Sequence, residues 1–91
     1  MTRKERVTRV IDGDTFETAV RKRAVRLANV DAPEKEGPGA SAATNFLKKL
    51  IKDKYVTVQV VARDKYGRAV ANVKVDGRSV NEAVRKKVKK K

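Results

Sequence analysis

The chain has 91 residues and a net charge of +13, and it contains neither cysteine nor histidine. Disulfides, thiolate metal sites and histidine chemistry are therefore excluded, so a bound metal would need oxygen ligands and a catalytic base would be a carboxylate, lysine or tyrosine. A chain of this length forms one domain with a small core. So strong a positive charge favours nucleic acid as the partner, with a basic surface kept for solubility as the alternative.

No apolar stretch approaches the roughly 20 residues of a membrane span, and the first ten residues lack the apolar core of a signal peptide. We therefore expect no membrane partner, and either a cytoplasmic protein or, for a trimmed mature form, an extracellular one. The chain has two tyrosines, two phenylalanines and no tryptophan, which is too few aromatic residues for a broad base-stacking surface.

The first third of the chain has short segments rich in apolar and β-branched residues between turn signals, which predict three strands, over residues 5–11, 15–20 and 24–30. Asp12-Gly13 and the basic segment 21–23 are predicted to be turns, and the glycine is expected to supply the positive φ of a tight turn. In the third strand Val25 and Leu27 share one face, so that Arg26 points to the opposite side.

A loop rich in proline and glycine follows over residues 31–39. From Pro38 to Asp53, apolar residues recur at steps of three and four and predict a helix. The apolar face of this helix consists of Ala43, Phe46, Leu47, Leu50 and Ile51.

Two further strands are predicted over residues 55–61 and 69–75, separated by a loop at 62–68. In the first of them, Val56, Val58 and Val60 are expected on one face. Asp76-Gly77 predicts another turn. Ser79 and Glu82 match a capping box, which predicts a terminal helix over 79–91 that ends in a frayed basic tail.

The predicted order is β-β-β-α-β-β-α, with no internal repeat and no linker. This order is typical of the five-stranded OB-fold barrel, a mainly β fold with helices (α+β) that often binds nucleic acid or sugars. The sequence therefore predicts a single OB-fold domain over residues 1–91.

Three carboxylates are expected to lie at one end of this barrel. If the first three strands form a meander, the turn that carries Asp14 and the loop that carries Asp31 and Glu34 meet at the same end. Without a cation these carboxylates would repel one another, and a hard divalent ion would relieve that repulsion. The alternative is equally good on spacing alone: Asp31 would cap a turn before Ala32-Pro33, and Glu34 would be solvated.

Two arginines could complete a site for a phosphodiester. Arg26 lies between apolar strand residues, where a guanidinium is costly without a charged partner. Arg68 begins the fifth predicted strand. Two guanidiniums near a carboxylate-bound cation would neutralise a phosphate, although structural salt bridges are the commoner use of such residues.

Four segments in this order resemble the thermonuclease (staphylococcal nuclease-like) family: "IDGDT", "RLANVDAPE", "GASAATNFLKKL" and "DKYGRAVANVKVDGRSVNEAV". The resemblance runs from about Val7 to Val88. It implies a calcium-dependent nuclease that cleaves DNA and RNA at the 5′ P–O bond and leaves 3′-phosphate ends.

The resemblance also implies a role for individual residues. It implies that Asp14, Asp31 and the backbone carbonyl of Ala32 hold Ca²⁺, with Asp12 as a supporting residue. It further implies catalysis by Glu34 as the general base and by Arg26 and Arg68 as phosphate-binding residues, and contact of Lys65 and Tyr66 with the terminal phosphate of the nucleotide.

Two departures from the family pattern stand out. The segment after Glu34 is short, and the chain ends at Lys91, where family members continue with tyrosines that pack on the base and then a third helix. We therefore expect a short version with weaker and less base-selective binding, either monomeric or weakly self-associating.

The alternatives to a nuclease are a non-catalytic OB-fold module that binds nucleic acid, and a basic structural protein assembled on RNA. Degenerate copies of this superfamily lose carboxylates or arginines. Here all five expected positions are filled, which favours the nuclease.

Overall fold

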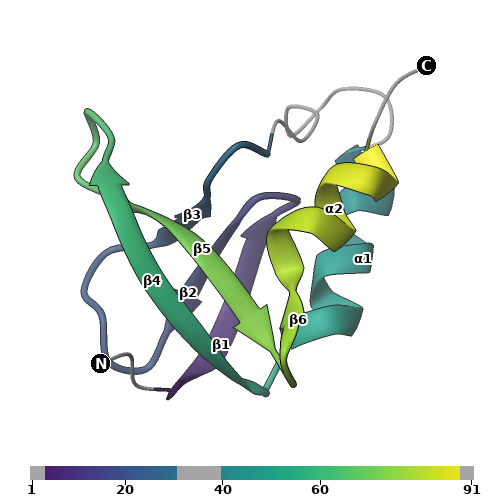
Figure 1. The fold of residues 1–91 in the computed structure, drawn as a ribbon, viewed down its shortest axis with the longest axis horizontal. Helices are drawn as coiled ribbons and strands as arrows, with labels where there is room; N and C mark the ends of the chain where they lie inside the picture. The colour runs from purple at the N-terminus through teal and green to yellow at the C-terminus, as the bar shows by residue number, and fades with distance from the viewer. Residues whose placement is uncertain (1–3, 31–39, 89–91) are drawn as a thin grey trace.

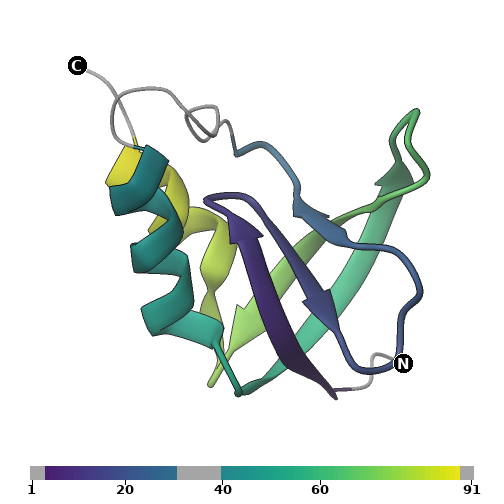
Figure 2. The same ribbon diagram turned by 180° about the vertical axis from the view of Figure 1, so that it is seen from behind.

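The computed structural model describes residues 4–30 and 40–88, which form six strands and two helices (Figures 1 and 2). The strands are β1 (Lys4–Asp12), β2 (Thr15–Thr18), β3 (Val25–Leu27), β4 (Tyr55–Arg63), β5 (Ala69–Val75) and β6 (Arg78–Ser79), and the helices are α1 (Ala40–Ile51) and α2 (Val80–Val88). Neither of these helices has the length and apolar character that crossing a bilayer requires.

The sheet closes into a ring. Its strand order is β3-β2-β1-β4-β5-β6, and β3 pairs additionally with β5. The β3–β5 pairing is parallel, with Val25 opposite Ala69 and Arg26 opposite Val70, whereas the other pairings are antiparallel. The predicted OB-fold barrel is confirmed, and the two-residue strand β6 is an addition that the sequence did not predict.

The core lies inside the barrel and between the barrel and its helices. Figures 1 and 2 show α1 and α2 side by side at one side of the sheet. The largest side chains with less than 2% exposure are Phe16, Leu27, Leu47, Ile51, Val7, Val25, Val30, Val56, Val73, Val80 and Val84. On α1, Ala43, Leu47 and Ile51 are buried, and Phe46 and Leu50 pack against the same core, so the predicted apolar face is confirmed.

Three strand predictions need correction. The second predicted strand ends at Thr18 rather than at residue 20. The third predicted strand is reduced to the three residues of β3. The fourth extends as β4 to Arg63, and Val60 is 39% exposed, whereas Val56 and Val58 are buried as expected. Residues 59–63 of β4 are exposed on both faces of the strand, so Val60 lies beyond the part of β4 that contacts the core.

The turns also differ in part from the prediction. Among the described glycines, positive φ occurs at Gly67 and Gly77 and not at Gly13. The turn between β1 and β2 is instead supported by a side chain, because the Asp14 N–H donates to Asp12 Oδ1 at 3.3 Å. At the start of α2 the Glu82 N–H donates to Ser79 Oγ at 3.1 Å, which confirms the predicted cap.

Candidate active site

Asp14 lies in the two-residue connection between β1 and β2 and is 9% exposed. The Thr15 hydroxyl donates to Asp14 Oδ1 at 2.9 Å. The Asp14 carbonyl accepts a hydrogen bond from the Leu27 N–H at 2.8 Å, which ties this turn to the end of β3. The carboxylate is therefore held by its own turn and by the neighbouring strand.

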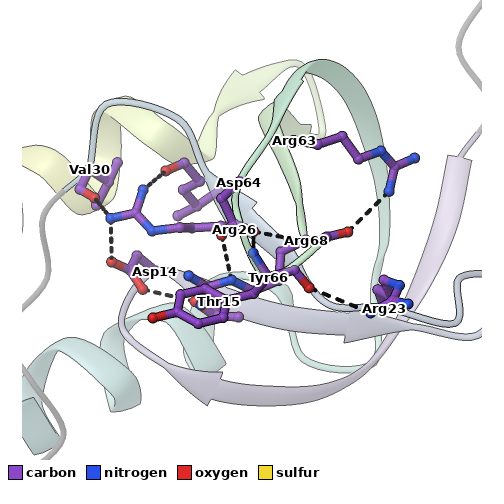
Figure 3. A network of polar contacts seen from close by, with 11 residues as sticks. Asp14, Thr15, Arg23, Arg26, Val30, Arg63, Asp64, Tyr66 and Arg68 are labelled. Carbon is purple, nitrogen blue, oxygen red and sulfur yellow. Dashed lines mark hydrogen bonds and ion pairs between the residues drawn. The ribbon is translucent and has the colours of Figure 1, made fainter.

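Arg26 on β3 lies directly beside this carboxylate (Figure 3). Its Nη2 atom is 3.4 Å from Asp14 Oδ2, and the side chains of the two residues are 26% and 13% exposed. The same guanidinium donates to the Leu27 carbonyl at 3.3 Å and to the Val30 carbonyl at 3.1 Å. Arg26 thus has the charged partner that its position between buried strand residues requires.

The environment of Asp14 disfavours its negative charge. Burial raises the pKa of the Asp14 carboxyl, and the neighbouring Asp12 carboxylate acts in the same direction. The Thr15 hydroxyl and the Arg26 guanidinium oppose this effect without cancelling it. An ionised Asp14 would therefore gain from a further cation, and carboxylate oxygens are the ligands that Ca²⁺ prefers.

Arg68 is held by the tight loop that precedes β5. Asp64 Oδ1 accepts hydrogen bonds from the N–H groups of Tyr66, at 3.0 Å, and of Arg68, at 2.9 Å. Asp64 Oδ2 accepts a hydrogen bond from Arg68 Nε at 2.6 Å. Desolvation opposes the ionised form of Asp64, but these hydrogen bonds together outweigh it and lower the pKa of the Asp64 carboxyl.

Pairing of β3 with β5 brings the two predicted arginines to one face. Arg26 lies opposite Val70 in register, and neighbouring residues of paired strands project to the same side of a sheet. Arg68 precedes Val70 by two residues and therefore projects to that side as well. Figure 3 shows both guanidiniums on the same side, with Tyr66 in front of Arg68.

Lys65 and Tyr66 lie at the tip of the same loop. The Tyr66 side chain is exposed, and its ring centroid is 5.4 Å from Lys65 Nζ and 5.2 Å from Arg68 Cζ. An aromatic ring at these distances attracts both cations. The structure thus places Lys65, Tyr66 and Arg68 together.

Asp31, Ala32 and Glu34 lie outside the described residues. Within 4–30 and 40–88 the acidic side chains form no group of three or more that could hold a metal. The described part of the candidate metal centre is therefore Asp14, with Asp12 beside it. The carboxylate of Asp14 is buried and offers hard oxygen donors, so it fits a calcium ion as one ligand.

Sequence reasoning missed Asp64, Asn81 and Arg85. Asn81 Nδ2 donates to the carbonyls of Ala28 and Ala71 at 2.9 and 3.0 Å, and its Oδ1 accepts the Val73 N–H at 2.8 Å. These bonds link α2, β5 and the segment that follows β3.

Arg85 supports the same segment, because its Nη1 donates to the Asn29 carbonyl at 3.0 Å. The sequence carried one signal for Asn81: it follows Val80, an apolar-face residue of the predicted amphipathic helix, at the point where that helix begins. A buried amide at such a position needs partners on other elements.

Comparison with known proteins agrees with this architecture. A family model described as "Staphylococcal nuclease homologue" matches residues 24–87, which include β3, α1, β4, β5 and most of α2. The chain belongs to this family.

Three relatives show the range of the similarity. An "Uncharacterized endonuclease" of Escherichia coli is 45% identical over 80 residues, covering 85% of this chain and 52% of that protein. The "Staphylococcal-like nuclease CAN1" of Arabidopsis thaliana is 33% identical over 79 residues, covering 87% and 24% of the two chains. "Protein ParB" of Escherichia coli is 38% identical over 72 residues, covering 77% and 41%. The chain thus spans about half the length, or less, of these relatives.

Proposed function

We propose that this protein is a calcium-dependent nuclease that hydrolyses phosphodiester bonds in DNA and RNA. The observation that carries the proposal is the pairing of β3 with β5. This pairing places Arg26, beside the buried Asp14 carboxylate, on the same face of the sheet as Arg68. Two guanidiniums and a desolvated carboxylate are the groups that a phosphodiester and a hard cation require. The names of the relatives point to the same chemistry.

Asp14, Asp31 and the carbonyl of Ala32 would hold the calcium ion. The raised pKa of Asp14 supports this assignment, because a cation would relieve the cost of its buried charge. When bound, the ion would neutralise negative charge on the phosphate and its ligands. Asp12 supports the site by accepting the hydrogen bond that shapes the turn.

Glu34 would act as the general base. It would take a proton from a water molecule, whose oxygen attacks the phosphorus atom. The bond between phosphorus and the 5′ oxygen would then break, and the 5′ oxygen would take up a proton from solvent, leaving a 3′-phosphate on one product and a 5′-hydroxyl on the other. The absence of histidine is compatible with this chemistry, because a carboxylate supplies the base.

Arg26 and Arg68 would bind the scissile phosphate and stabilise the charge of its five-coordinate transition state. Among the described residues Arg68 uses only Nε for a side-chain hydrogen bond, so its two Nη groups face no protein acceptor. Such a guanidinium can bind a phosphate with two parallel hydrogen bonds. Lys65 and Tyr66, beside Arg68, would contact the terminal phosphate of the nucleotide.

The first test is cleavage of single-stranded DNA and RNA at alkaline pH with millimolar CaCl₂, in parallel with EGTA and with the Glu34→Gln variant. We expect products that depend on calcium and a loss of turnover of about 10²–10⁴-fold in Glu34→Gln. Binding of DNA by this variant, measured by fluorescence anisotropy, should stay close to that of the wild type. Normal cleavage by Glu34→Gln would remove its role as the base.

The alternative is a nucleic-acid-binding module without catalysis. One observation favours it: Arg26 already has Asp14 and two backbone carbonyls as internal partners, as a structural arginine would. The two functions separate in the same assay. Binding that weakens steeply with salt, without any calcium-dependent cleavage, would establish the binding module.

A further inference from the structure

A second basic site lies next to the candidate active site, at the connection between β2 and β3. A cavity of about 250 Å³ is lined by Arg21, Lys22, Arg23, Arg63 and Ala69. Among the residues that the structure describes, no acidic side chain lines this cavity. We refer to it as the basic pocket.

Two of its arginines are anchored to the Asp64–Arg68 loop. Arg23 Nη1 is 3.5 Å from the Tyr66 carbonyl oxygen, and Arg63 Nη1 donates to the Gly67 carbonyl at 3.3 Å. Among the described residues each guanidinium makes only this one hydrogen bond, although it carries five N–H donors. Both groups therefore contact the loop while most of their donors remain available for a ligand.

Arg23 also packs against the backbone of Gly67. Its Cδ and Nη1 atoms are 3.2 Å from the position that a Cβ would take at Gly67, which has a φ of +83°. A glycine at this point lets the guanidinium approach the loop closely. This contact restricts Arg23 before a ligand binds, which reduces the entropy lost on binding.

Arg21 forms a fixed wall of the basic pocket. Its Nε and Nη2 atoms each donate at 2.8 Å to the carboxylate of Glu5, which is 6% exposed and also accepts a hydrogen bond from the Thr18 hydroxyl. Glu5 balances the charge of Arg21 and none of the other cations. Lys22, Arg23 and Arg63 have no ion-pair partner among the described residues, so three positive charges share one cavity.

Figure 3 shows Arg23 and Arg63 on the opposite side of Tyr66 and Arg68 from Asp14 and Arg26. The pocket and the candidate active site therefore lie on two sides of one loop. A strand whose scissile phosphate contacts Arg26 and Arg68 would carry further phosphates past this loop.

We propose that the basic pocket binds a backbone phosphate of the nucleic-acid strand, next to the phosphate that is cleaved. This proposal rests on the proposed function. Arginine forks match phosphate oxygens in geometry, and a bound phosphate would relieve the repulsion among the three uncompensated cations. The pocket is a polar site that can contact the sugar-phosphate backbone of DNA or RNA without reading its bases.

The test uses Lys22→Glu, because Lys22 makes no hydrogen bond to the Asp64–Arg68 loop. The new carboxylate would oppose a phosphate in the basic pocket. Lys48→Glu is the matched control, with the same change of charge at an exposed position of α1, at the helical side of the molecule (Figure 1). Fluorescein-labelled single strands of 2 and 12 nucleotides are titrated in EGTA, with binding followed by anisotropy at several salt concentrations. Calcium-dependent cleavage is measured in parallel.

We expect Lys22→Glu to weaken binding of the 12-nucleotide strand about tenfold more than Lys48→Glu does, and to lower its salt slope by about 1. The 2-nucleotide strand should distinguish the two variants far less, because its one phosphodiester cannot occupy both sites. Arg63→Gln should act in the same direction as Lys22→Glu.

Equal effects of Lys22→Glu and Lys48→Glu on the 12-nucleotide strand, with normal wild-type cleavage, would overturn the pocket assignment and leave the nuclease intact. Absence of both binding and cleavage in the wild type would instead refute the proposed function and this inference with it. Inorganic phosphate is then added to the complex with the 12-nucleotide strand, and displacement of the strand is compared with that by chloride at equal ionic strength. Equal displacement of the 12-nucleotide strand from the wild type and from Lys22→Glu by phosphate would contradict a phosphate site in the basic pocket.

Discussion

Two aspartate–arginine pairs lie near each other in this protein. The pKa values of their two carboxyls are shifted in opposite directions. Asp64 receives hydrogen bonds from two backbone N–H groups and from Arg68, and its pKa is lowered. Asp14 is buried next to Asp12, and its Oδ2 atom is 3.4 Å from Arg26 Nη2, a longer distance than that between Asp64 and Arg68. The pKa of Asp14 is raised. The same pair of residue types therefore has two different electrostatic outcomes.

This difference separates a structural carboxylate from one suited to a ligand. The donors around Asp64 favour its ionised form, so that its loop needs no further cation. Asp14 is desolvated without full compensation, which is the condition in which an added cation contributes most. Perturbed carboxylates of this kind cluster at functional sites. The following variants test that contrast, from the largest expected effect to the smallest.

Asp14→Asn should reduce kcat/KM for single-stranded DNA by about 10³-fold, because it removes a ligand of the calcium ion that would neutralise charge on the phosphate. Calcium-free thermal stability should stay the same or rise, because the neutral amide avoids the cost of a buried charge beside Asp12. Activity is measured with CaCl₂, and unfolding is followed by circular dichroism in EGTA.

The pH dependence of stability provides a control for Asp14. A carboxyl whose pKa is raised in the folded state contributes its stability at low pH and loses it as the pH rises through the folded pKa. The calcium-free wild type should show this loss, and Asp14→Asn should not. A variant that is less stable yet cleaves normally would make Asp14 a structural residue.

Arg26→Lys and Arg68→Lys should each lower kcat by about 10²-fold, because lysine keeps the charge but lacks the planar fork that binds phosphate oxygens. Single-turnover kinetics separates this loss from weaker binding. A normal rate in either variant would assign that arginine to structure alone.

Asp64→Asn should lower kcat/KM about tenfold, because it weakens the hydrogen bonds that orient Arg68 rather than removing a group that touches the substrate. Its thermal stability should fall, in contrast to that of Asp14→Asn. Stability unchanged in Asp64→Asn would contradict a structural role for this carboxylate.

The acid limb of stability follows from the lowered pKa of Asp64. Its contribution is present above the unfolded pKa of about 3.9 and is lost as the pH falls through the lower folded value. NMR signals of the Tyr66 and Arg68 amides should therefore shift only below that pH. A titration midpoint of these amide signals above the unfolded pKa of Asp64 would show that the hydrogen bonds to Asp64 do not form in solution.

Gly67→Ala should destabilise the protein by about 1–2 kcal/mol, because alanine at a φ of +83° is sterically unfavourable. Gly77→Ala is the matched control, with a φ of +80° and no atom within 4 Å of the added methyl group. The excess cost at Gly67, measured by urea unfolding, reports the contact with Arg23. Equal costs would show that this contact is dispensable.

Regular elements with local signals were predictable from the sequence. The strand over residues 69–75 has its predicted bounds, because its apolar side chains alternate throughout. The Ser79 cap was predictable for the same reason, since all of its interactions lie within four residues. The exposure of Val60 was not predictable, because the point at which β4 extends beyond the core depends on the tertiary packing of the barrel.

Parts of the candidate site were beyond local reasoning. Arg26 could be predicted to leave the apolar face of its strand, and Asp14 could be placed in a turn. Their distance, and the alignment of Arg26 with Arg68, depend on strands that are far apart in the chain. The anchoring role of Asn81 has the same origin, since its partners lie on other elements.

Residue types and their order alone determined the class of the fold, the oxygen-based chemistry and the positive field of this protein. Local periodicity and charge are properties of neighbouring residues, so they can be obtained without coordinates. The opposite pKa shifts of Asp14 and Asp64 and the basic pocket were decided only by the tertiary structure. Burial, desolvation and the closure of β3 on β5 arise when distant segments meet, and these conditions determine what each charged side chain can do.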